Sequence, residues 1–155
     1  MKKYKVLVIN RLTLVDPKQL GRSIVNRLTE PLEYLYQKGL VEFEVFNPEN
    51  ITYKILETKK FDVVFINKSC DQLTLEAARI IDSLKIEIIY DLDDNIFEFP
   101  SYSNGSSENK SIGLEILKIS SKIITCNLPL ERLIWKHLKK RTTIIEHGIN
   151  VDTVS

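Results

Sequence analysis

The chain has 155 residues, 43% of them hydrophobic, with 22 Lys and Arg against 21 Asp and Glu, a formal net charge of +1. This length fits one domain, and a composition with only 5 Gly and 5 Pro excludes disordered and fibrous classes. The near-zero net charge excludes a wholly basic surface, so we expect no nucleic-acid partner.

No leader or membrane span is indicated. The apolar run near the N-terminus stops at Asn10, too early for a signal peptide, and no stretch approaches the roughly 18 apolar residues of a membrane span. The two cysteines, Cys70 and Cys126, lack the spacing of a zinc site and are too few for a disulfide framework, so we expect free thiols. These features predict a cytoplasmic protein.

Six short runs rich in Val, Ile and Phe predict strands, at residues 4–10, 41–47, 61–67, 86–91, 122–126 and 142–146. Several of them are almost continuously apolar, which is typical of strands buried on both faces of a parallel sheet. Helical patterns alternate with the strands. We therefore predict an α/β fold, a Rossmann-like, doubly wound, mostly parallel sheet of six to seven strands with helices on both faces.

The first helix is predicted to begin near Pro17, with Asp16 as its N-cap. Because Pro31 removes a backbone donor, we expect a kink or a new helix there, closed by Gly39. The apolar face of this segment is predicted to hold Leu32, Leu35 and Tyr36. Further helices are predicted over residues 49–58, 72–84, 110–121 and 128–140, the last with Asn127 as N-cap, and a surface loop over residues 100–110.

Polar side chains follow most of the predicted strands. The carboxyl ends of parallel strands share one edge of the sheet, where ligands bind. Asp91, Asp93 and Asp94 follow an apolar strand and repel one another, so they need solvent, cations or a ligand around them. They could bind Mg²⁺, accept hydrogen bonds from sugar hydroxyls, act in acid/base chemistry, or cap a helix with their charges in water. The candidate cleft residues at this edge are Asn10, Arg11, Lys68, Ser69, Asp91, Asp93, Asp94, Asn95 and His147.

Two further segments bear on ligands. Residues 10–16, after the first strand, contain no glycine-rich phosphate loop, so we expect no nucleotide or other cofactor bound by this chain alone. Residues 135–141, from Trp135 to Arg141, are basic. Their cations could complement the dipole of a helix end, or make a peripheral contact with the inner face of an anionic membrane.

Residues 88–97, Ile-Ile-Tyr-Asp-Leu-Asp-Asp-Asn-Ile-Phe, resemble motif I of the haloacid dehalogenase-type phosphatases. This resemblance would make Asp91 the nucleophile and Asp93 the general acid of a Mg²⁺-dependent phosphatase. That family usually opens with this strand, whereas 90 residues precede Asp91 here. No second acidic pair completes a magnesium site, and Asn95 replaces the usual threonine. The phosphatase is therefore the alternative interpretation.

The whole chain more closely resembles the N-terminal domain of a family 4 glycosyltransferase of the GT-B architecture. The matching segments are residues 27–35, 61–68, 90–97 with Pro100, 121–126 leading into 130–133, and 144–150. The last segment departs from the family sequence, with Glu146 and His147 where Pro-Asn is common and Asn150 where Asp is common.

The glycosyltransferase resemblance implies that residues 1–155 form a single Rossmann-like, acceptor-side domain, inactive without a C-terminal donor-binding domain. The full-length parent would transfer a sugar from a nucleotide-sugar donor to a glycan or lipid-linked acceptor in surface polysaccharide biosynthesis. Many relatives have a histidine where Asp91, Asp93 and Asp94 stand, so the resemblance assigns no catalytic residue and no metal ligand. A non-catalytic α/β binding module also remains open.

Overall fold

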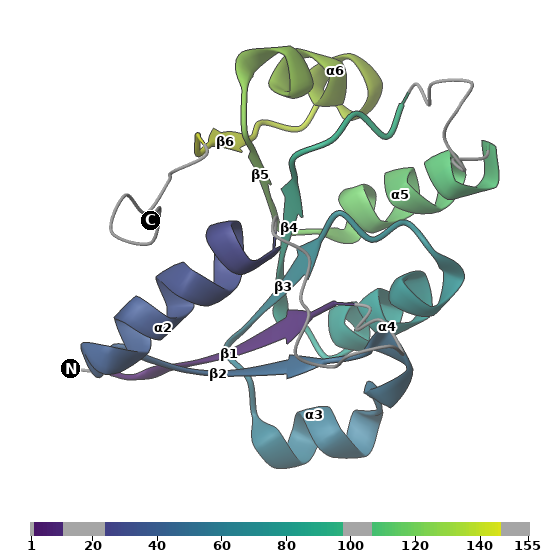
Figure 1. The fold of residues 1–155 in the computed structure, drawn as a ribbon. Helices are drawn as coiled ribbons and strands as arrows, with labels where there is room; N and C mark the ends of the chain where they lie inside the picture. Colours follow the sequence, from purple (N-terminus) through teal and green to yellow (C-terminus); the bar gives the residue numbers. More distant parts are fainter. Residues whose placement is uncertain (1, 11–23, 98–106, 147–155) are drawn as a thin grey trace, which may run out of the picture.

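The computed structural model of the protein describes residues 2–10, 24–97 and 107–146. A six-stranded, all-parallel sheet lies at its centre, with the strand order β2-β1-β3-β4-β5-β6 (Figure 1). The strands are β1 (Tyr4–Ile9), β2 (Val41–Phe46), β3 (Val63–Asn67), β4 (Glu87–Leu92), β5 (Lys122–Thr125) and β6 (Thr143–Ile144). The fold is the predicted Rossmann-like, doubly wound α/β class.

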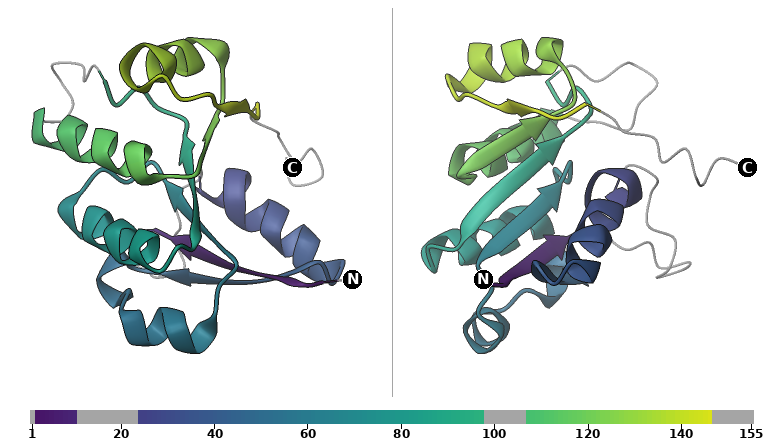
Figure 2. Two further views of the ribbon diagram at one scale, coloured as in Figure 1. Left: turned by 180° about the vertical axis from the view of Figure 1, so that it is seen from behind. Right: turned by 90° about the vertical axis from the view of Figure 1, so that its left-hand side faces the viewer.

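Helices cover both faces of the sheet. They are the π-helix η1 (Val25–Thr29), α2 (Glu30–Gln37), the 3-10 helix η2 (Pro48–Asn50), α3 (Tyr53–Lys59), α4 (Gln72–Ser83), α5 (Ser107–Ile119) and α6 (Leu128–Leu138). Figure 2 shows α2 on one side of the sheet and α4, α5 and α6 on the other.

The sheet faces divide the core into two clusters. Successive side chains of a strand point to opposite faces, so Leu7 and Ile9 of β1 join the larger cluster with α4, α5 and α6. Val6 and Val8 join the smaller cluster with Leu28 and other residues of η1 and α2. Within the described residues, the smaller cluster is the one that leaves part of its sheet face open, and this is where the candidate site lies.

The predicted break at Pro31 takes the form of a π-helix. The chain winds as η1 directly before α2, whose first turn contains Pro31. In this π turn the Glu30 N–H donates to the carbonyl of Val25, five residues earlier, directly before the proline, which has no N–H to donate. Gly39 closes the segment with a φ of 71° that suits glycine. The prediction for Tyr36 is wrong, because its side chain is 55% exposed, with the Lys3 ammonium over its ring.

Three other predicted bounds also change. The predicted helix over residues 49–58 divides into η2 and α3, because Thr52 accepts a hydrogen bond from the Ile55 N–H and starts a new helix. Helix α5 begins at Ser107, inside the predicted loop, of which residues 100–106 lie outside the described part. The predicted start at Asp16 and Pro17 also lies outside it. Strand β6 has two residues in place of five.

The cysteine prediction is confirmed, since Cys70 and Cys126 are free thiols. Across residues 2–10, 24–97 and 107–146, none of the helices is both long and apolar enough to cross a membrane.

Candidate functional site

A buried ion pair occupies the carboxyl end of β4. Arg27 Nε donates hydrogen bonds to Asp91 Oδ2 at 2.8 Å and to Oδ1 at 3.1 Å, and Arg27 Nη2 donates a further bond to Oδ1. The side chains of Arg27 and Asp91 are only 4% and 2% exposed. The hydrogen bond to Asp91 raises the pKa of Arg27 above its already high ordinary value, so the guanidinium stays charged.

Strand register supplies the second partner of Asp91. Asn67 is the β3 residue opposite Asp91 in the parallel ladder. Its side-chain Nδ2 donates a 2.9 Å hydrogen bond to Asp91 Oδ2. Both carboxylate oxygens are therefore satisfied by protein donors, which compensates the cost of burying the charge.

Arg27 also joins the ends of three distant segments. Its Nη1 donates a 3.2 Å hydrogen bond to the carbonyl of Ile145, 118 residues later. This contact ties the chain just after β6 to η1 and to β4. Because β6 is the edge strand, this contact links Arg27 to that edge of the sheet as well as to β4.

Beside this ion pair lies a groove of about 390 Å³ between α2 and the open part of the sheet face. Most of its lining is apolar, with one charged end at the ion pair and an acid at the rim. The lining residues are Arg27, Leu28, Pro31, Leu32, Leu35, Phe65, Asp91, Ile124, Ile145 and Glu146. We call this depression the α2 groove. Its lining suits a mainly apolar ligand with a polar end.

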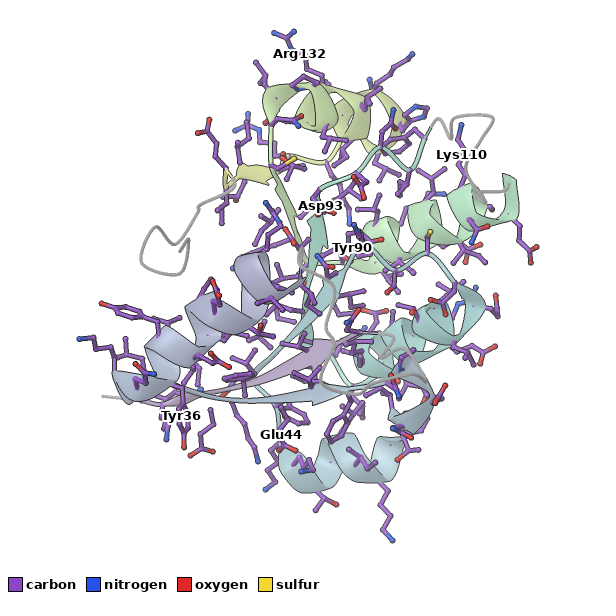
Figure 3. All side chains as sticks on the ribbon, in the orientation of Figure 1. Tyr36, Glu44, Tyr90, Asp93, Lys110 and Arg132 are labelled. Carbon is purple, nitrogen blue, oxygen red and sulfur yellow. The ribbon has the colours of Figure 1, made fainter. Side chains whose placement is uncertain are left out.

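The other two acids of the cluster turn toward Lys68. Lys68 Nζ lies 2.8 Å from Asp94 Oδ2 and 3.6 Å from Asp93 Oδ1. Asp93, close to the end of β4 in Figure 3, is 7% exposed, whereas the Asp94 side chain is 69% exposed. Burial alone would lower the pKa of Lys68, but the hydrogen bond to Asp94 and the charges of both acids outweigh it, so the pKa is raised. Two cations, Arg27 and Lys68, thus lie against the three acids, one of the arrangements expected from their repulsion.

Three further predicted residues shape the loops of this edge. Asn95 Oδ1 accepts a 2.9 Å hydrogen bond from the Phe97 N–H and closes a turn. The carbonyl of Ser69 accepts a 2.9 Å hydrogen bond from the Tyr90 hydroxyl. Asn10 follows β1, and its backbone N–H donates to the carbonyl of Phe46. Arg11 and His147 lie outside the described residues.

Sequence reasoning did not include Arg27 or Asn67 among the site residues. A signal for each exists in the sequence. Asn67 ends the strand that precedes the strand of Asp91, and consecutive strands of a doubly wound sheet are often neighbours. Arg27 is the only base between Arg22 and Lys38, within a helix of apolar periodicity, where a buried charge needs a partner.

The donor set does not fit a metal ion. Among the described residues, no three His, Cys, Asp or Glu side chains lie close enough together to hold one. Asp91 lies against a guanidinium and an amide, so a nucleophilic attack by this carboxylate would first require the ion pair with Arg27 to break. The geometry therefore favours a positioning role for Asp91 over the nucleophilic role that the phosphatase resemblance implies.

No family model matches this chain, and no curated protein matches it.

Proposed function

We propose that this chain is the acceptor-side domain of a glycosyltransferase that transfers a sugar from a nucleotide-sugar donor to a glycan or lipid-linked acceptor, in surface polysaccharide biosynthesis. The observation that carries the proposal is the convergence of the segments on which the resemblance rests. Arg27, Phe65, Asp91, Ile124 and Ile145 come from five such segments and line the single α2 groove. Asp91 and Ile145 lie at or beyond the carboxyl ends of their strands, the general position of ligands in doubly wound sheets.

The chemistry of this edge suits a sugar attached to an apolar carrier. Ionised carboxylates accept strong, directional hydrogen bonds from hydroxyl groups. Asp94 and Lys68, 69% and 40% exposed, can exchange their mutual contact for sugar hydroxyls. Leu32, Leu35 and Phe65 of the α2 groove would contact the apolar part of the acceptor.

The residues of this chain would bind and orient the acceptor. The ion pair of Arg27 with Asp91 holds the start of the α2 segment against β4, and so sets the position of one wall of the groove. The donor's nucleotide would bind elsewhere in the full-length enzyme, because no glycine-rich loop follows β1 in the sequence. We assign no catalytic residue to this chain.

Sugar transfer by the natural protein that contains this chain is the direct test. The protein would be incubated with radiolabelled nucleotide sugars and a membrane lipid extract, and labelled glycolipid would be counted. Asp94→Asn should lower transfer about 10- to 100-fold, the equivalent of one lost charged hydrogen bond. Glu115→Gln, an exposed acid of α5 that pairs with Arg79, is the matched control and should leave transfer unchanged.

Three results would contradict this proposal in whole or in part. Transfer that survives both Asp94→Asn and Lys68→Met would keep the sugar-transfer activity but remove the acceptor role from this edge. Mg²⁺-dependent hydrolysis of a phosphomonoester by the 155-residue chain, abolished by Asp91→Asn, would instead establish the phosphatase. If neither sugar transfer nor phosphate hydrolysis is detected but the acceptor still binds, the chain would be a non-catalytic binding module.

A further inference from the structure

The outer side of α6 carries a second depression, of about 610 Å³, between the helix and the segment that leads into β6. Leu128, Arg132, Trp135 and Arg141 contribute to its lining. Lys139 Nζ lies 5.8 Å from the centre of the Trp135 ring. We call these five residues the α6 patch. It lies far from α3 at the opposite end of the sheet, and Arg132 projects outward from it (Figures 1 and 3).

Helical periodicity explains why these side chains share one face. Positions 128, 132 and 135 repeat at intervals of four and three residues, and so form one stripe. The opposite stripe, with Leu130 and Ile134, is buried against the sheet. Leu128 and Trp135 are 46% and 48% exposed, so their apolar surface is left outside the core.

Not every cation of this region is available to a ligand. Lys140 Nζ donates to the carbonyls of Leu117, Lys118 and Ser120 and so satisfies the C-terminal end of α5. Burial lowers the pKa of Lys140, which fits this structural role. Arg132, Lys139 and Arg141 are instead exposed to solvent.

Positive charge and exposed apolar side chains are concentrated in and around α6. Residues 128–142 contain five Lys and Arg and one Glu, whereas the chain as a whole is only +1, so the remainder is net negative. Five exposed Leu, Ile and Trp side chains occur in the described part of the chain, and four of them lie in α6, in β6 or directly after β6. The four are Leu128, Trp135, Ile144 and Ile145.

We propose that the α6 patch docks the protein onto a membrane surface of anionic phospholipid. Phosphate headgroups would pair with Arg132, Lys139 and Arg141, while Trp135 and Leu128 would enter the interface. Leu128 of the patch, together with the exposed Ile144 of β6 and Ile145 after it, favours this occupant over nucleic acid, because aliphatic side chains gain little from a phosphate backbone. The inference does not depend on the proposed glycosyltransferase function, since any protein with this surface would bind such vesicles.

Trp135 makes the test specific to this surface, because the chain contains one tryptophan. The protein would be titrated with phosphatidylcholine vesicles and with vesicles of equal parts phosphatidylglycerol and phosphatidylcholine. Only the anionic vesicles should shift the Trp135 emission to shorter wavelength and sediment the protein. Added salt should weaken both effects, because it screens charges at a surface.

Two double variants distinguish binding through the α6 patch from a general effect of net charge. Arg132→Gln with Arg141→Gln should weaken vesicle binding about 25-fold, roughly fivefold for each cation. Lys38→Gln with Lys54→Gln removes the same net charge from exposed sites directly after α2 and on α3, and this variant should bind as the original chain does. Circular dichroism of each variant would verify the fold.

The proposal is overturned if anionic vesicles leave the chain in solution, or if both double variants bind equally. Sedimentation with an unmoved Trp135 emission would assign the membrane contact to another surface. A blue shift with single-stranded RNA but not with vesicles would assign the patch to nucleic acid.

Discussion

Asp91 and Asp94 are three residues apart and have opposite environments. Asp91 continues the side of β4 that faces α2, so its carboxylate enters the interior and meets Arg27 and Asn67. Asp94 lies beyond the strand, and its carboxylate meets Lys68 at the surface. The acidic run therefore forms two different sites. Asp91 belongs to a buried ion pair beside the α2 groove, and Asp94 is accessible to a ligand.

The buried pair gives a prediction about stability. Arg27→Met should lower the free energy of unfolding by about 3–5 kcal/mol, because it leaves Asp91 buried without its cation. Adding Asp91→Asn should restore a large part of the loss by removing that charge. Urea unfolding of the single and double variants measures both effects.

An exposed pair provides the control for this prediction. Arg79 and Glu115 are 56% and 46% exposed, so Arg79→Met should cost about 0.5 kcal/mol or less. Equal losses for Arg27→Met and Arg79→Met, or no recovery in the double variant, would show that burial does not set the strength of the Arg27 pair.

At the scale of elements, side chains at the ends of strands and helices determine where each one starts. Asp71 and Asn127 accept hydrogen bonds from the Thr74 and Leu130 N–H groups and cap α4 and α6. Asp62 directly precedes β3. Its carboxylate accepts hydrogen bonds from the Lys2 ammonium and from the Lys5 N–H, so it fastens β1 to the segment before β3.

Asp62 predicts a pH dependence of stability. The hydrogen bond from Lys2, together with the one from the Lys5 N–H, lowers the pKa of Asp62 below its ordinary value. The stabilisation is therefore complete above the unfolded-state pKa of about 3.9, and is lost as pH falls through the lower folded-state pKa.

Asp62→Asn keeps an acceptor oxygen and removes the charge. The difference in unfolding free energy between this variant and the original chain should be constant near pH 6 and should shrink toward pH 2. Urea titrations across this range would measure it. A difference that does not change with pH would mean that the charge of Asp62 contributes nothing to stability.

At the scale of the whole molecule, the order of the sheet decides which parts are most protected. Strands β1, β3 and β4 lie inside the sheet, with Leu7, Val64 and Tyr90 all 0% exposed. Strand β6 lies at one edge and both of its residues are exposed. The groove and the α6 patch both lie toward this less protected end.

Native-state hydrogen exchange should reveal this gradient. The amides of Val8, Val64 and Ile66 should exchange only through global unfolding, whereas those around β6 should exchange through local opening. Because Arg27 holds the carbonyl of Ile145, Arg27→Met should speed exchange near β6 more than in β1. Equal protection of the Ile145 and Val64 amides would contradict this gradient.

The sequence by itself determined the strands, their parallel arrangement and the polar edge at which they end. Those features follow from local chemistry: apolar runs such as 61–67 must be buried, and Asn127 caps a helix through its own neighbours. Only the tertiary structure decided that Asp91 pairs with Arg27, 64 residues away, and that Trp135 stays outside the core. Partners so distant in sequence are selected by strand order and helix packing, which no local pattern encodes.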